Sequence, residues 1–207
     1  MPTLLLFSDI HNDRSACDRL MDRASDVDVV VGAGDFCTMR RGLPKVIRRL
    51  SVIDTPSVLV PGNSESAAEL RSAVHDADWE AATVLHGETA TLAGLRFFGI
   101  GGGIPITPFG SWSYDLSEDD ARALLTECPD HAVLVSHSPP YNVVDQDSRG
   151  RHLGSSALRE TIERTTPRLT VCGHIHGSWG EVGTLADTPV VNAGPHGRVW
   201  DLDAPAA

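Results

Sequence analysis

Five short apolar runs divide this chain, and each is followed within a few residues by a side chain that can bind a metal. The runs are residues 4–7, 29–31, 58–60, 133–135 and 169–171. Their length and their content of leucine and valine predict buried strands. In open α/β sheets, ligands bind beyond the carboxyl ends of such strands. We therefore expect the segments that follow these runs to meet at one place in the fold.

The segments between the runs predict helices and further short strands. Helical patterns near 13–24, 43–51 and 65–75 alternate with the first three runs, and Asp13 and Ser64 are candidate N-caps. Later strands are expected at 83–86, 88–92, 95–100, 180–185, 189–192 and 197–202, and helices after Ser117 and at 155–164. This order predicts an α/β fold in which two sheets pack face to face between helices.

Size and composition predict one globular unit. The 207 residues, 41% of them hydrophobic, fit a single domain spanning 1–207. The start of the chain lacks the features of a secretory leader, and no apolar stretch approaches the roughly 18 residues of a membrane span. The four cysteines show no C-x-x-C spacing. These features predict a soluble cytoplasmic protein with reduced thiols and no membrane partner.

The net charge argues against one class of function. With 28 acidic and 17 basic residues, the chain carries a formal charge of -11. A protein that binds nucleic acid through its phosphates needs a basic surface instead. We therefore expect nucleic acid to be an unlikely partner.

The residues after the strands form a set of metal-binding groups. Asp9 and His11 make a D-x-H motif, and His174 and His176 make an H-x-H motif. If these motifs are extended, the side chains at i and i+2 point the same way and can bind one ion. The remaining candidates are Asp35 on a tight Gly-Asp turn, Asn63 and His137. Carboxylate, amide oxygen and imidazole together suit two divalent metals.

The motifs D-x-H, GD, GN, a later His and G-H-x-H, in this order, resemble those of the calcineurin-like metallophosphoesterase superfamily. The resemblance extends from Asp9 to about Asn192. The stretches 136–140 and 173–176 are most similar to the small, uncapped prokaryotic and archaeal phosphoesterases of that superfamily. The fold that this resemblance implies is a four-layer αββα sandwich of two mixed β-sheets flanked by helices.

The resemblance also implies a dinuclear centre in which Asp35 bridges two ions. One ion would take Asp9, His11, Asp35 and His176, and the other Asp35, Asn63, His137 and His174. We expect Mn²⁺ first, with Fe, Zn, Ni or Co as substitutes. The implied activity is hydrolysis of phosphodiesters, or of activated phosphomonoesters, of small substrates through a hydroxide that bridges the metals.

One position departs from the family pattern. Many members have a histidine after the Gly-Asn pair that helps to protonate the leaving group, and here Ser64 follows Asn63. Ser64 could bind phosphate or simply cap a helix, but its hydroxyl is a poor acid. We therefore expect good leaving groups, or His152 as the acid, unless His152 only makes a structural hydrogen bond. Asn63 is predicted to be catalytic as well as a ligand.

The loops suggest what the substrate contains. Phe109, Trp112 and Tyr114 lie in loop 101–115, and Arg149 is predicted to bind substrate from loop 138–153. Aromatic and arginine side chains suit a base and a phosphate, so a nucleotide-like substrate is one interpretation. Packing of the aromatics beneath the loop is the other.

Two alternatives to this enzyme remain. One is a non-catalytic interaction scaffold on the same fold, and the other is a nuclease. The filled ligand positions argue against the first, and the short acidic chain against the second. An oligomer is compatible with the sequence.

Overall fold

The first β-sheet of the computed structural model, which describes residues 2–202, holds the amino-terminal strands. Its members are β1 (Thr3–Phe7), β2 (Val29–Gly32), β3 (Ser57–Leu59), β4 (Ala82–Val84) and β11 (Arg198–Asp201). They are arranged in the order β11-β1-β2-β3-β4. Strands β1 to β4 run parallel, and β11 pairs with β1 in the antiparallel direction.

The second sheet holds the later strands. Its members are β5 (Glu88–Leu92), β6 (Leu95–Ile100), β7 (Val133–Ser136), β8 (Leu169–Cys172), β9 (Val182–Leu185) and β10 (Thr188–Asn192). The order is β5-β6-β7-β8-β10-β9, with a parallel centre and an antiparallel strand at each edge. Both sheets are therefore mixed, as predicted.

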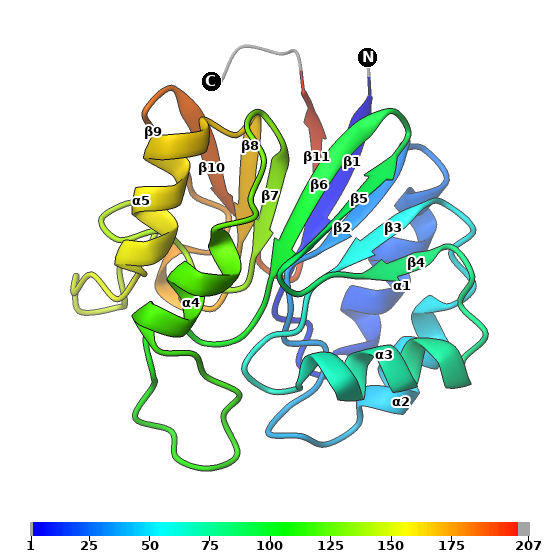
Figure 1. Cartoon of the computed structure of the whole chain (residues 1–207). Helices are drawn as coiled ribbons and strands as arrows, with labels where there is room; N and C mark the ends of the chain where they lie inside the picture. The colour runs from blue at the N-terminus through cyan, green and yellow to red at the C-terminus, as the bar shows by residue number, and fades with distance from the viewer. Residues whose placement is uncertain (1, 203–207) are drawn as a thin grey trace.

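Helices cover the outer face of each sheet (Figure 1). They are α1 (Arg14–Ala24), α2 (Leu43–Leu50), α3 (Ala67–Asp76), α4 (Glu118–Leu125) and α5 (Ser156–Thr165). One apolar core joins α1, α2 and α3 to the first sheet, and another joins α4 and α5 to the second. A third core fills the space between the sheets. These cores confirm the predicted four-layer sandwich.

Strand β1 shows how the sequence produces these layers. Its four consecutive apolar residues are fully buried. Leu4 and Leu6 belong to the core between the sheets, whereas Leu5 and Phe7 belong to the core beneath the helices. A strand that is covered on both faces needs apolar residues at successive positions, because side chains alternate between the faces. The uninterrupted run therefore follows from the central place of β1.

The predicted helix starts are partly confirmed. Asp13 caps α1 by accepting from the backbone of Ser15 and Ala16. Ser64 was expected to cap α3, and this prediction is wrong. The N-cap is Ser66, which forms a capping box with Glu69. The Ser66 hydroxyl accepts from the Glu69 backbone N–H, and the Glu69 side chain accepts from the Ser66 backbone N–H. This reciprocal pair decides in favour of the later serine.

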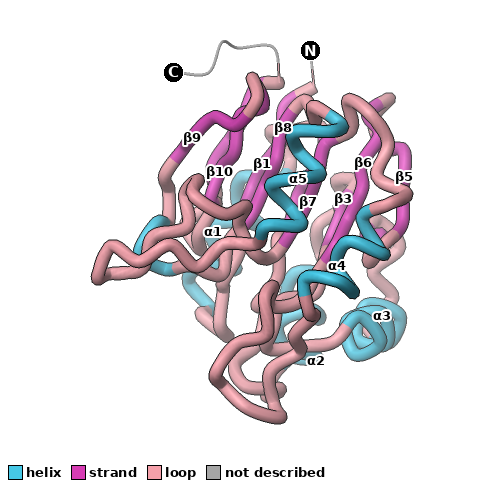
Figure 2. The backbone as a smooth tube through the Cα atoms, turned by 60° about the vertical axis from the view of Figure 1, so that its left-hand side comes forward, coloured by secondary structure: helices cyan, strands magenta, loops and turns pink. Residues whose placement is uncertain are grey.

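The carboxyl ends of the parallel strands point away from the chain ends. In Figure 1 the N-terminus lies at the top, and the strands carry the chain toward the bottom. Figure 2 shows the long loops, in pink, gathered at that lower end. The residues that follow β1, β2, β3, β7 and β8 therefore collect at one end of the sandwich.

Two further expectations concern the environment of the protein. All four cysteines are buried and free. Within residues 2–202, none of the helices combines the length and the apolar character needed to cross a membrane.

Candidate metal centre

The first cluster of ligand atoms joins β1 to the loop after β8. The Nε2 atoms of His11 and His176 are 3.3 Å apart. They lie 3.9 and 3.6 Å from Asp9 Oδ1. Two ligands that share an ion at about 2.1 Å lie about 3.0–3.4 Å apart, so small movements would allow these three atoms to hold one cation. The structure thus groups Asp9, His11 and His176 as a possible metal site.

The backbone of this cluster differs from the extended form that we predicted. The φ angles are 54° at Asp9, 46° at His11, 57° at Asp35 and 65° at His174. Left-handed conformations are costly for residues with a Cβ, and they concentrate at functional sites where the surroundings enforce them. Tight turns, and not the alternation of an extended strand, therefore bring the D-x-H and H-x-H side chains together.

Asp35 lies between the two predicted metal positions. Its Oδ2 is 3.5 Å from His11 Nε2, and its Oδ1 is 3.5 Å from His137 Nε2. One carboxylate therefore reaches a histidine of each predicted set. Ser64 holds this carboxylate from behind, because its backbone N–H donates to Oδ1 at 2.8 Å and its hydroxyl to Oδ2 at 3.2 Å.

The second cluster is compatible with a bound cation. His137 contacts the Ala33 carbonyl through Nδ1 at 2.7 Å, so that nitrogen carries the proton. Its Nε2 faces Asn63 Oδ1 at 3.3 Å. Asn63 presents that oxygen because its Nδ2 donates to Ser113. With neutral His137, two acceptor lone pairs face each other, and a cation between them removes the conflict.

Hydrogen bonds and nearby charges keep the buried Asp9 carboxyl ionised. Burial by itself raises the pKa of Asp9, but the His176 hydrogen bond, the His137 charge and the Ser8 hydroxyl together lower this pKa to about 2. Further donors are the backbone N–H of His174, 3.1 Å from Oδ2, and Trp179 Nε1 at 3.3 Å. Asp9 is therefore a fixed carboxylate anion at neutral pH.

The buried histidines respond differently to their surroundings. Burial lowers the pKa of His137, but the Asp35 and Asp9 carboxylates outweigh it and raise this pKa. Burial also lowers the pKa of His174, and the His137 charge adds to the effect, bringing it to about 4. The two rings lie 4.9 Å apart between centroids. His174 therefore offers a neutral imidazole beside the second cluster, as metal binding requires.

Two glycines allow the ligand loops to approach each other. A Cβ on Gly62 would lie 2.0 Å from Asp35 Oδ1. Gly34 has a φ of +89°, and a Cβ there would lie 2.6 Å from Gly62. Only glycine fits where backbone passes this close to a ligand. The Gly-Asp and Gly-Asn motifs therefore follow from the geometry of the centre.

Glu65 supports the centre and was missed by the sequence analysis. It is fully buried and accepts from the backbone N–H groups of Asp35, Phe36, Cys37 and Gly62 at 2.8–3.3 Å. The side chain therefore fixes the loop that carries Asp35 to the loop that carries Asn63. Its position directly after the Gly-Asn-Ser segment was the only available signal.

Trp179 is a second supporting residue that the sequence analysis missed. Its indole packs against the His176 ring at a tilt of 34°, with centroids 4.0 Å apart, and its N–H donates to Asp9. One side chain thus orients two of the predicted ligands. Groups of this kind tune metal sites by fixing the ligands in place.

A cavity of about 640 Å³ opens over the two clusters. Among the predicted ligands, His11, Asp35, Asn63, His174 and His176 line it, and so does Ser64. Arg149 and His152 do not, whereas Arg151 and Leu153 from the same loop do. The loop thus reaches the cavity through neighbours of the two residues that we predicted to act there.

His152 has partners outside the cavity lining. Its Nδ1 is 2.6 Å from the buried carboxylate of Asp145, and its Nε2 is 3.0 Å from the Gln146 amide. Both ring nitrogens therefore have structural contacts. Its role as a proton donor stays a prediction, as does substrate binding by Arg149.

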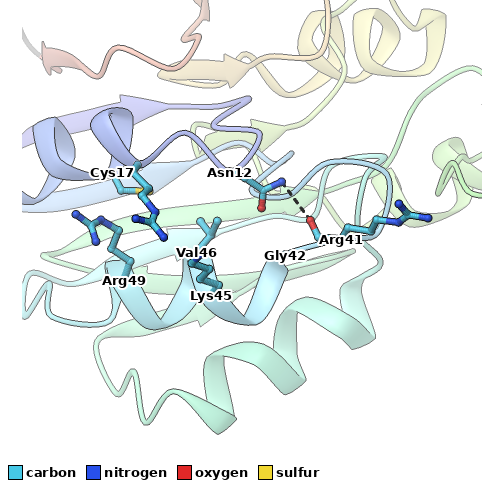
Figure 3. A pocket seen from close by; sticks show the side chains of 8 residues that line it. Asn12, Cys17, Arg41, Gly42, Lys45, Val46 and Arg49 are labelled. Atoms are coloured by element: carbon cyan, nitrogen blue, oxygen red, sulfur yellow. Dashed lines mark hydrogen bonds between the residues drawn. The ribbon is translucent and has the colours of Figure 1, made fainter.

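A second cavity, of about 400 Å³, lies between α1 and α2 (Figure 3). Four basic side chains line it, those of Arg14, Arg41, Lys45 and Arg49. Asn12 also lines it and donates to the Arg41 carbonyl at 3.1 Å. None of the seven predicted metal ligands takes part in this lining.

Comparison with known proteins identifies the family. The family model for calcineurin-like phosphoesterases matches residues 2–178. The chain belongs to the calcineurin-like phosphoesterase family. The matched span includes all seven of the predicted metal ligands.

Individual relatives are distant. The human metallophosphoesterase domain-containing protein 1 is 27% identical over 203 residues, covering 80% of this chain and 59% of that protein. The chain spans less than two thirds of the length of the curated relatives that it matches.

Two solved structures share the fold. The protein TT1561 of Thermus thermophilus matches with a TM-score of 0.76 at 17% identity, over 97% of this chain and 99% of that one. A dimetal phosphatase from Danio rerio matches with a TM-score of 0.63 at 15% identity, over 94% and 88%. The match to TT1561 extends over nearly the full length of both chains.

Proposed function

We propose that this protein is a dinuclear metal-dependent phosphodiesterase that acts on small substrates. The observation that supports this most directly is the place of the Asp35 carboxylate, whose two oxygens lie 3.5 Å from histidines of two different ligand clusters. Such a carboxylate can serve two cations at once. The fold shared with a dimetal phosphatase from Danio rerio supports the dinuclear part of this proposal.

The residues divide between two ions as follows. Asp9, His11, Asp35 and His176 would hold one, and Asp35, Asn63, His137 and His174 the other. Among the described residues, the groups whose atoms already lie close enough to share an ion are Asp9 with His11 and His176, and Asp9 with Asp35 and His137. Divalent ions bound there would supply positive charge that lowers the pKa of water and neutralises phosphate oxygens. Imidazole, amide and carboxylate donors suit Mn²⁺, with Fe, Zn, Ni or Co as substitutes.

The lack of an acid beside Asn63 favours phosphodiesters, or monoesters with a good leaving group. The Ser64 hydroxyl is committed to the Asp35 carboxylate. His152 lies outside the cavity lining, in contact with Asp145 and Gln146. An alkoxide that leaves without a proton donor leaves slowly, whereas an aryl oxide does not need one. The substrate should therefore carry its own good leaving group.

Hydrolysis of two chromogenic esters tests this proposal. Protein stripped of metal by a chelator should be inactive and regain activity with Mn²⁺. Its kcat/KM should be about 10-fold higher for bis(4-nitrophenyl) phosphate than for 4-nitrophenyl phosphate. A reversed preference would identify a monoesterase. If both esters are still hydrolysed after all metal has been removed, the enzyme is not metal-dependent.

A further inference from the structure

The rim of the metal cavity carries most of the large apolar side chains that remain exposed within residues 2–202. There are seven such side chains, those of Met39, Val52, Ile106, Phe109, Tyr141, Leu153 and Val199. Four of them line this one cavity: Met39, Ile106, Phe109 and Leu153, which are 52, 68, 50 and 41% exposed. Exposed apolar groups gathered at a cavity mark a binding surface.

Three separate segments supply this apolar rim. Met39 follows β2, Ile106 and Phe109 lie in the long loop before α4, and Leu153 precedes α5. In Figure 1 the long green loop before α4 projects from the lower end of the molecule, where the ligand loops gather. Phe109 stacks on Trp112 with ring centroids 5.6 Å apart and planes 15° apart. The fold thus brings the rim together from three segments, and no single apolar segment accounts for it.

The loop before α4 is anchored directly to a metal-ligand candidate. The Asn63 side-chain amide donates to the Ser113 hydroxyl at 2.9 Å, and the backbone carbonyl of Asn63 accepts from the Tyr114 backbone N–H at 2.9 Å. Asp115 braces the loop by accepting from Ser113 and from Thr107 at 2.7 Å each. A group held by the rim would therefore be close to a phosphate at the metal centre.

The charges in the cavity favour an uncharged substituent. Apart from the predicted ligands, the charged residues that line the cavity are Asp147 and Arg151. They pair with each other at 2.7 Å. The rim therefore offers no unpaired cation among the described residues to recognise a second phosphate. A polyphosphate or a nucleic-acid strand would leave its charges without partners there.

We infer that the substrate is a phosphoester with an apolar substituent, an alkyl chain or an aromatic ring, that lies against Met39, Ile106, Phe109 and Leu153. This inference rests on the proposed phosphoesterase activity. The inferred substrate is less polar than the nucleotide-like substrate that the sequence suggested. The rim provides specificity, because each buried methylene strengthens binding while the chemistry at phosphorus stays the same.

A series of alkyl 4-nitrophenyl phosphodiesters tests the inference with a constant leaving group. The alkyl group is varied from methyl to butyl and hexyl, and the Mn²⁺-loaded enzyme is assayed. We expect kcat/KM to rise about 2- to 4-fold per methylene. Values that do not change with chain length would overturn the inference, although the enzyme would still be a phosphodiesterase.

Matched variants connect the effect to the rim. Ile106→Ser combined with Leu153→Ser alters two exposed side chains, so the fold should be retained. This variant should flatten the rise of kcat/KM with chain length to less than about 1.5-fold per methylene. Val52→Ser is the control, since Val52 is 67% exposed and does not line the cavity. For Val52→Ser, kcat/KM should rise with alkyl chain length as it does in the wild type.

A binding measurement separates this inference from the proposed activity. Hexylphosphonate should bind the Mn²⁺-loaded protein at least about 10-fold more tightly than methylphosphonate in calorimetric titration. The double variant should lose that difference. If no diester is hydrolysed, the proposed function fails, and the titration still tests the rim. If the double variant changes only the oligomeric state, the rim is a subunit contact and the inference is wrong.

Discussion

Asp35→Asn is expected to reduce kcat by about 10³-fold or more and to prevent the binding of two ions together. Asparagine keeps an acceptor for the Ser64 backbone N–H and nearly the same volume. It loses the charge and the second oxygen that face His11 and His137. Rates with bis(4-nitrophenyl) phosphate and Mn²⁺ counts on the same sample would measure both effects.

The control for Asp35→Asn is Asp22→Asn, an exposed position on α1. It makes the same chemical change far from the ligand clusters and should leave kcat within about 2-fold of wild type. Full activity in Asp35→Asn with two bound ions would exclude Asp35 as the bridging ligand.

Glu65→Ala is expected to cause the largest loss of stability. It would leave four backbone N–H groups, those of Asp35, Phe36, Cys37 and Gly62, without their acceptor. Each unsatisfied buried group costs about 1–3 kcal/mol, and partial entry of water would recover some of that. We expect a loss of about 4 kcal/mol in the free energy of unfolding. In a chain of this size that lowers Tm by roughly 8–16 °C.

Thermal unfolding of metal-free protein measures this effect without a contribution from metal binding. Glu80→Ala is the matched control, because Glu80 is exposed, and its Tm should stay close to that of wild type. Burial and the Asp35 charge raise the pKa of Glu65 to about 7, and the N–H donors of Gly62 and Cys37 oppose this rise. A Tm for Glu65→Ala that matches the control would show that the four hydrogen bonds contribute little.

The positions of the candidate metal-binding residues were predictable because they depend on strand order. Asp9 follows β1 and Asp35 follows β2, and these strands are parallel neighbours. Their carboxyl ends had to coincide once both runs were buried strands. The four layers were predictable for a similar reason, because an uninterrupted apolar run indicates a strand that is covered on both faces.

The backbone of the D-x-H segment was not predictable from its local sequence. The N–H groups of Asp9 and His11 donate to the carbonyls of Gly34 and Asp35. These contacts connect two loops that are far apart in the sequence, and they hold both residues in left-handed conformations. A local pattern cannot show that a partner segment will impose a costly conformation.

The roles of Ser64 and Glu65 were hidden for a related reason. Ser64 donates to Asp35, and Glu65 accepts from the loop around Asp35. Both partners belong to the previous βα unit, so the segment after Asn63 resembled only the start of a helix. The apolar rim escaped notice because Met39, Ile106 and Leu153 come from three loops that no periodicity connects.

Titration of metal-stripped protein with Mn²⁺, with bound ions and diester hydrolysis followed together, tests the dinuclear centre most directly. We predict that two ions bind per chain and that activity appears only as the second one binds. A folded protein that reaches full activity with a single bound ion, or that binds none, would contradict a centre built on Asp35 as the shared ligand.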